Sequence, residues 1–66
     1  MESLHSQPLR LLRRAEVERR CGIRRSTVYR LMQEEDFPAP VRIGPRAVRW
    51  RESDIDAWIR SRPPAT

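Results

Sequence analysis

The chain has 66 residues, a net charge of +5 and a sequence pI of about 11.2, which leaves room for one domain with a small core. One cysteine and one histidine exclude an internal disulfide and a zinc site of known spacing, so no metal or cofactor is expected. Two glycines are too few for a glycine-rich phosphate loop, and no apolar run has the length of a signal sequence or a membrane span. We expect a cytoplasmic protein that is not an enzyme and has no membrane partner.

All 14 basic residues are arginine, and they are unevenly distributed. Eight lie within residues 10–30 and four within 42–51, whereas acids gather in 34–36 and 52–56. This alternation predicts a basic face of the kind that binds phosphates. The alternatives are codon bias toward arginine in a GC-rich genome and a charged surface that contacts only water. The acids of 34–36 are interpreted as a solvated helix end and not as a catalytic carboxylate pair.

Flexible tails are predicted at both ends of the chain. Residues 1–8 and 63–66 have no periodic apolar face, and Pro63 and Pro64 block the continuation of a helix. The working domain is therefore predicted at residues 9–62.

Two helices separated by a tight turn are predicted first. The helix from Arg14 to Cys21 has apolar residues that share a face, namely Ala15, Val17 and Cys21. Gly22 is placed to end it as a left-handed cap, and Ile23 is apolar enough to be buried in the turn. The second helix, over residues 25–35, has apolar residues at the spacing of one helical face, namely Val28, Leu31 and Met32.

A β-hairpin and a third helix follow. The prolines of residues 37–40 end the second helix, and apolar residues then alternate with arginines on either side of the turn at 44–47. We expect a two-stranded hairpin over residues 41–51 with its apolar side chains inward and its arginines outward. Acids in a first turn and an apolar stripe of Ile55, Trp58 and Ile59 predict a helix over 52–60.

This order of elements predicts a mostly α protein with a small β-hairpin, the winged helix-turn-helix. None of the pieces buries enough surface alone, so one shared core is expected. Its predicted members are Val17, Ile23, Val28, Leu31, Phe37, Trp50 and Trp58. For the two tryptophans, packing in this core is favoured over stacking on single-stranded bases.

The second helix is predicted to lie in the major groove of DNA, with its first residues closest to the bases. The candidate contacts are Arg24, Arg25, Ser26, Thr27, Tyr29 and Arg30. Thr27 is also placed to turn back and cap the helix, and the Tyr29 ring has the alternative of leaning on the hairpin.

The hairpin provides a second predicted contact surface, and no acid lies within it. Its candidates are Arg42, Arg46, Arg49 and Arg51. Arg46 at the turn is best placed to enter a narrow minor groove. For Arg49 and Arg51 the alternative is packing over Trp50 or pairing with acids of the third helix.

Three blocks of the sequence resemble the AlpA-type prophage regulators, a branch of the MerR-like winged-helix group that includes phage excisionases. The blocks are RSTVYRLM, FPAPVRIGPRAVRW and ESDIDAWI. The resemblance implies that the second helix is the recognition helix and that the wing contacts the neighbouring groove or backbone. Family members usually carry serine or threonine where this chain has Arg24, so Ser26, Thr27 or a bound phosphate is expected to satisfy the helix start.

The resemblance implies two functions, transcriptional regulation of prophage integrase genes and excision in which attachment-site DNA is bound and bent. We favour the regulator, bound to double-stranded DNA in the nucleoid, with further copies of itself on adjacent sites. A basic adaptor for a protein such as the integrase or RNA polymerase is the remaining alternative. No coiled coil is predicted after the third helix, so a MerR-type ligand sensor is not expected.

Overall fold

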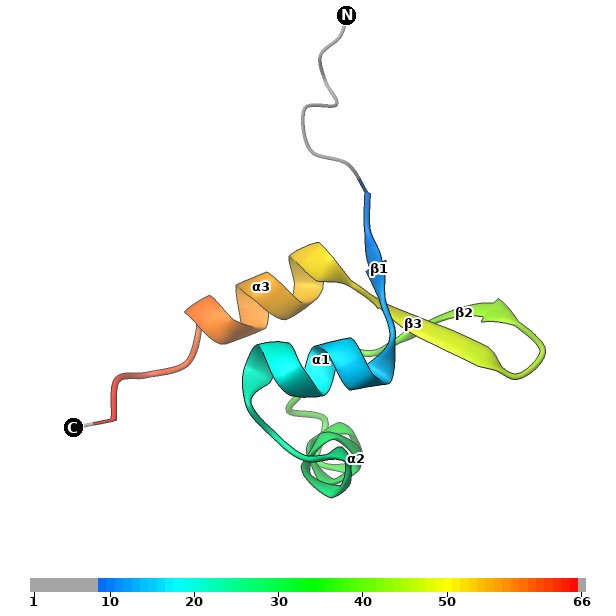
Figure 1. The fold of residues 1–66 in the computed structure, drawn as a ribbon. Coiled ribbons are helices and arrows are strands. Elements are labelled where there is room, and N and C mark those ends of the chain that lie inside the picture. Colours follow the sequence, from blue (N-terminus) through cyan, green and yellow to red (C-terminus); the bar gives the residue numbers. More distant parts are fainter. Residues whose placement is uncertain (1–8, 66) are drawn as a thin grey trace, which may run out of the picture.

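The fold is a winged helix-turn-helix, seen in a computed structural model that describes residues 9–65 (Figure 1). The elements in chain order are β1 (Leu11–Leu12), α1 (Arg14–Cys21), α2 (Arg25–Gln33), β2 (Val41–Gly44), β3 (Ala47–Arg51) and α3 (Glu52–Arg60). The predicted fold class is confirmed, as are the predicted bounds of the first and third helices. The predicted tail at 1–8 lies outside the described residues.

The turn between α1 and α2 is set by Gly22. Its φ is +70°, a left-handed conformation that glycine adopts without a Cβ clash. The amides of Gly22 and Ile23 both donate to the carbonyl oxygen of Glu18, at 2.8 and 3.1 Å. Ile23 then packs against the core. The chain therefore turns within three residues and places α2 across α1 (Figure 1).

The C-terminal end of α2 uses the same geometry without a glycine. Glu35 has a φ of +57°, and its amide donates to the Met32 carbonyl at 3.0 Å. The Asp36 amide donates to the Leu31 carbonyl at 2.9 Å, which completes a Schellman ending. α2 therefore ends at Gln33, two residues before the predicted end, because the chain must turn left-handed before the prolines.

Replacing Glu35 by glycine is expected to stabilise the domain by about 1 kcal/mol, because glycine removes the left-handed strain of a side-chain-bearing residue. For a domain of this size that gain corresponds to a rise in melting temperature of about 4–8 °C. Glu34→Gly, which removes the same charge at a φ of −83°, should give no gain. Thermal unfolding followed by circular dichroism measures both; equal melting temperatures for the two variants would contradict the strain at Glu35.

A third strand, β1, was not predicted. It pairs antiparallel with β3, with Leu11 opposite Arg51 and Leu12 opposite Trp50, so the sheet order is β1-β3-β2. Two residues are too few to show a period-2 pattern in the sequence. The pairing matters because it places Leu12 in the core and fixes the start of α1 beside the base of the wing (Figure 1).

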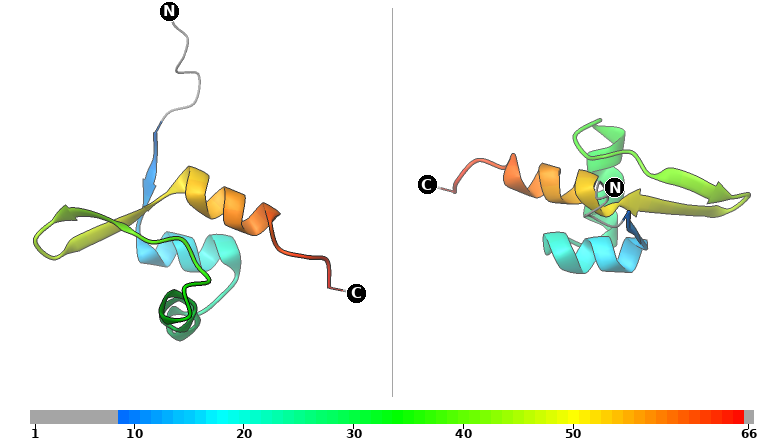
Figure 2. Two further views of the ribbon diagram at one scale, coloured as in Figure 1. Left: turned by 180° about the vertical axis from the view of Figure 1, so that it is seen from behind. Right: turned by 90° about the horizontal axis from the view of Figure 1, so that it is seen from above.

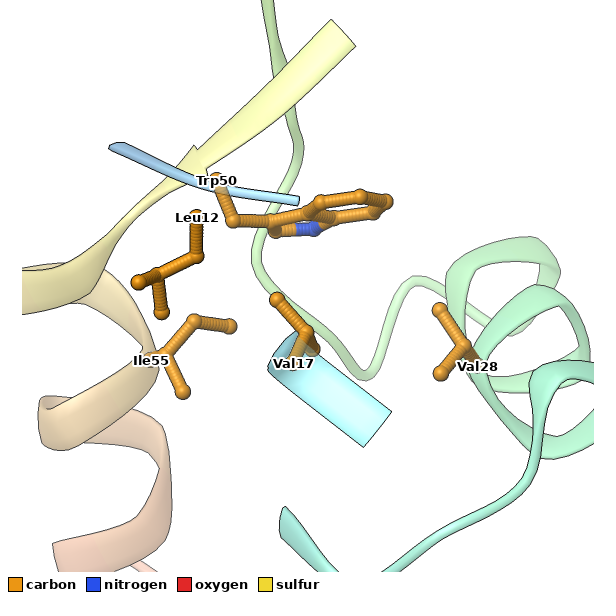
Figure 3. Close-up of a cluster of buried hydrophobic side chains, with 5 residues drawn as sticks. All are labelled: Leu12, Val17, Val28, Trp50 and Ile55. Atoms are coloured by element: carbon orange, nitrogen blue, oxygen red, sulfur yellow. The ribbon is translucent and has the colours of Figure 1, made fainter. Parts of the chain in front are cut away.

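The core consists of five side chains that are at most 2% exposed, Leu12, Val17, Val28, Trp50 and Ile55 (Figure 3). Three of these were predicted, and Leu12 and Ile55 were missing from the predicted set. Ile23 and Phe37 pack against this cluster only partly buried, while Leu31 and Trp58 are half-buried. A chain this short has one fully buried layer, so the other predicted members lie at its rim.

The prediction that the hairpin's apolar residues point inward is wrong at its outer half. Ile43 is 49% exposed and Val48 is 38% exposed, whereas Trp50 in the same strand as Val48 is buried. The physical reason is visible in Figures 1 and 2: beyond Trp50 the hairpin projects away from the helices and has no core to face. Ala15 of α1, predicted on an apolar face, is likewise exposed.

Two indole N–H groups fix the segment that joins α2 to the wing. Trp50 Nε1 donates to the Pro38 carbonyl at 3.0 Å, and Trp58 Nε1 donates to the Asp36 carbonyl at 2.8 Å. The Phe37 ring packs edge-on against Trp58 with ring centroids 4.8 Å apart. Both tryptophans therefore position the wing relative to α2.

Candidate nucleic-acid interface

The first turn of α2 is exposed and electropositive. Arg24 occupies the N-cap position in an extended conformation, no side chain caps the helix, and the first turn contains no acid. Arg25 and Ser26 are exposed, whereas Thr27 is half-buried. Within residues 9–65 neither serine nor threonine replaces the missing cap, so a cationic helix start presents its amides outward.

Farther along α2, Arg30 is exposed and forms a weak ion pair with Glu34 one turn later, at 3.4 Å. Such surface pairs contribute little and are easily exchanged for another partner. Arg30 therefore remains available on the same exposed side of the helix as the first turn.

Tyr29 lies between two arginines. Its ring is 5.8 Å from the Arg25 guanidinium carbon, and the Arg14 side chain of α1 lies beside its hydroxyl. Interaction with Arg14, and to a smaller extent with Arg25, lowers the pKa of Tyr29 below its ordinary value of 10.0. Tyr29 is still 44% exposed, so it links α1 to α2 at the surface.

The only tyrosine of the chain makes this arrangement measurable. An absorbance titration of the tyrosinate band should give a pKa below 10.0 for the wild type, because the positive neighbours stabilise the phenolate. Arg14→Gln should raise that pKa toward 10.0, while Arg60→Gln on α3 should leave it unchanged. If Arg14→Gln and the wild type titrate alike, Arg14 does not contact the hydroxyl.

The wing arginines differ in their surroundings. Arg42 donates to the Pro45 carbonyl at 3.1 Å and Arg49 to the Val48 carbonyl at 2.8 Å, both within the hairpin. Together with Arg46 they have no carboxylate partner within residues 9–65. Arg51, at the base of the wing, instead lies 3.7 Å from Asp54 of α3. Arg51 therefore matches the alternative interpretation of pairing with the third helix.

A surface groove of about 450 Å³ lies between the start of α1, α2 and the wing. It is lined by Arg13, Arg14, Tyr29, Arg46, Arg49 and Trp50, among others. The structure thus brings together three predicted site residues with two arginines of α1 that sequence reasoning missed. We call this the α1–wing groove.

Ion pairs join α1 and the segment before it to the acidic side chains of α3. Arg20 of α1 bridges Glu52 at 2.8 Å and Asp56 at 3.1 Å. Arg10 lies 3.6 Å from Glu16 and 3.8 Å from Glu52. The acids of α3 are therefore paired within the domain, and the α2 and wing side keeps its positive charge.

Two other kinds of site are absent from the part of the chain that the structure describes. No group of three or more metal-ligating side chains is found among residues 9–65. No helix in that part is both long and apolar enough to cross a membrane.

Comparison with known proteins agrees with this architecture. The model of the family described as "Prophage CP4-57 regulatory protein (AlpA)" matches residues 10–63. The chain belongs to the AlpA family. The AlpA match extends over all six elements, which confirms the resemblance inferred from the three sequence blocks.

One curated relative is "Uncharacterized protein ORF88" of Enterobacteria phage P4, which is 42% identical over 53 residues. The alignment covers 80% of this chain and 60% of that relative, so the chain spans less than two thirds of the relative's length. No solved structure matches the chain.

Proposed function

We propose that this AlpA-family protein is a sequence-specific double-stranded DNA-binding transcriptional regulator. α2 lies in the major groove, and the wing at residues 41–51 contacts the adjacent minor groove or backbone. One observation carries the proposal: four exposed arginines have no carboxylate partner within residues 9–65, namely Arg24, Arg25, Arg42 and Arg46, while Glu52 and Asp56 of α3 pair with Arg20 of α1.

Base readout is assigned to the start of α2. Arg25 and Arg30 have the bidentate geometry that recognises guanine, and Ser26 hydrogen-bonds a base or a phosphate. Arg24 and the uncapped amides beside it bind a backbone phosphate. Thr27 is half-buried, so it contributes less to DNA contact than Ser26, and Tyr29 holds Arg25 in place through its ring.

The wing supplies affinity that depends little on sequence. Arg46 at the turn enters the minor groove, where the negative potential favours arginine, and Arg42 and Arg49 contact phosphates. Arg51 contributes less, because Asp54 already meets part of its charge.

A single domain offers few base contacts, so several copies occupy adjacent or repeated sites in the nucleoid. Contacts with the integrase or RNA polymerase are the proposed means by which bound copies act on transcription.

A second candidate, the excisionase, is favoured by one observation at the wing. Ile43 and Val48 are large apolar side chains that remain exposed near the tip of a cationic hairpin. Apolar side chains inserted beside a minor-groove arginine unstack bases and bend the duplex. Such bending is what an excisionase requires at attachment-site DNA.

Salt-titrated binding to short duplexes tests DNA binding itself. Neutralising about five to seven phosphates gives a slope near −5 in a plot of log K against log salt concentration. A slope near zero on every duplex would reject the DNA-binding proposal and favour the protein adaptor. A bend measured on an attachment-site fragment, with no effect on nearby promoters, would favour the excisionase.

A further inference from the structure

The α1–wing groove differs in charge from the rest of the surface around α1. A second hollow, beside β1 and the start of α3, is lined by Arg10 and Arg51 together with Glu52 and Asp56, so its charges balance. No acid is among the residues that line the α1–wing groove. Four arginines therefore converge on a groove that holds no countercharge of its own.

The pairing of the individual arginines sharpens this contrast. Three guanidinium groups of the groove form no ion pair with a carboxylate within residues 9–65, those of Arg13, Arg46 and Arg49. Arg14 lies 3.0 Å from Glu18, yet it also interacts with Tyr29, and both Arg14 and Tyr29 line the groove. The groove thus presents donors from α1, α2 and the wing with few acceptors to satisfy them.

The walls of the groove are held firmly. Trp50 at its base is 2% exposed and tied to Pro38, and β1 fixes the start of α1 through its pairing with β3. The amide of Arg13 donates to the Glu16 carboxylate at 2.9 Å, which fixes the first turn of α1. The arginines are therefore carried by elements that strand pairing and hydrogen bonds join to one another.

We propose that the α1–wing groove binds the sugar-phosphate backbone of the DNA strand that separates the two grooves, with Arg13 and Arg14 of α1 as phosphate-binding residues. This inference rests on the proposed function. With α2 in the major groove and the wing at the minor groove, the intervening strand must pass between them, and the groove lies there. The occupant is a phosphodiester chain because only a repeated anion meets donors from three elements in a row.

Arg13→Gln tests the inference, with Arg60→Gln on the far end of α3 as the control that removes the same charge. On a duplex of random sequence, Arg13→Gln should make the slope of log K against log salt shallower by about 0.9, as expected for one lost phosphate contact. Arg60→Gln should keep the wild-type slope. Arg14→Gln should act like Arg13→Gln. Matching circular dichroism spectra and melting curves establish that the variants are folded.

The possible outcomes distinguish a failure of the proposed DNA binding from a failure of the groove alone. A wild-type protein without salt-dependent duplex binding would overturn both the proposed function and the groove. A steep wild-type slope that Arg13→Gln and Arg60→Gln both leave unchanged would overturn the groove alone. Phosphate ethylation gives an independent readout: modified phosphates between the α2 and wing contacts should block the wild type, and ethylation there should matter less for Arg13→Gln.

Discussion

Replacing Trp50 by alanine is expected to lower the free energy of unfolding by about 3–5 kcal/mol. Trp50 is the largest buried side chain, it lies beside Leu12 and Val17 in the core, and it pairs across the sheet with β1 (Figure 3). Its indole also anchors the segment between α2 and the wing through Pro38. Small domains have a total stability close to this loss, so the variant should be largely unfolded at 25 °C.

Trp50→Phe is the matched control, because it keeps an aromatic ring in the core and removes the N–H donor to Pro38. It should destabilise the domain less than the alanine variant does. The lost N–H hydrogen bond should cost about 1–2 kcal/mol, and the smaller ring should add a further loss of packing. Unfolding should remain cooperative. Urea unfolding followed by circular dichroism measures both. A Trp50→Ala variant that unfolds at nearly the wild-type midpoint would show that Trp50 does not hold the sheet and α2 together.

Arg25→Lys should remove most of the protein's sequence preference while leaving its charge intact. Lysine has no planar fork with which to pair bidentately with guanine, and a good pair of that kind contributes about 1–3 kcal/mol, or roughly 5- to 150-fold. Affinity for the preferred duplex should fall by that factor, whereas affinity for a random duplex should change little. Competition binding with the two duplexes measures the ratio directly.

Arg42→Ala provides the contrast on the wing. Its charge is expected to meet phosphates, so its loss should weaken preferred and random duplexes by the same factor and make the salt slope shallower. If Arg25→Lys and Arg42→Ala change the ratio of affinities equally, the division between a base-reading helix and a backbone-binding wing is wrong.

Much of the fold follows from local signals in the sequence. The apolar spacing in α1 and α3 and the left-handed turn at Gly22 predicted these elements at their observed positions. The structure departs from the prediction where the local conformation depends on contacts between residues that are distant in the sequence. The two residues of β1 form a strand only because β3 lies beside them, and Glu35 adopts a left-handed conformation that glutamate does not signal. Ile43 and Val48 follow the apolar alternation of a strand, but they are exposed because the core does not extend to them.

The candidate site was likewise predicted only in part from the sequence. The exposed face of α2 follows from its helical period and from its place after a tight turn, so its candidates were named from the sequence. Arg13 and Arg14 were not predicted as site residues, because only the pairing of β1 with β3 brings the start of α1 next to the wing. The doubled arginine at the start of the first helix was the available signal.

The most direct test of the central claim is selection of the intact protein on a library of random duplexes, followed by footprinting of the enriched sequence. We expect one enriched motif. It should be protected in the major groove over the bases that α2 reads and in the flanking minor groove where Arg46 enters. Enrichment of no motif, or protection that is the same on every duplex, would contradict sequence-specific recognition by this domain.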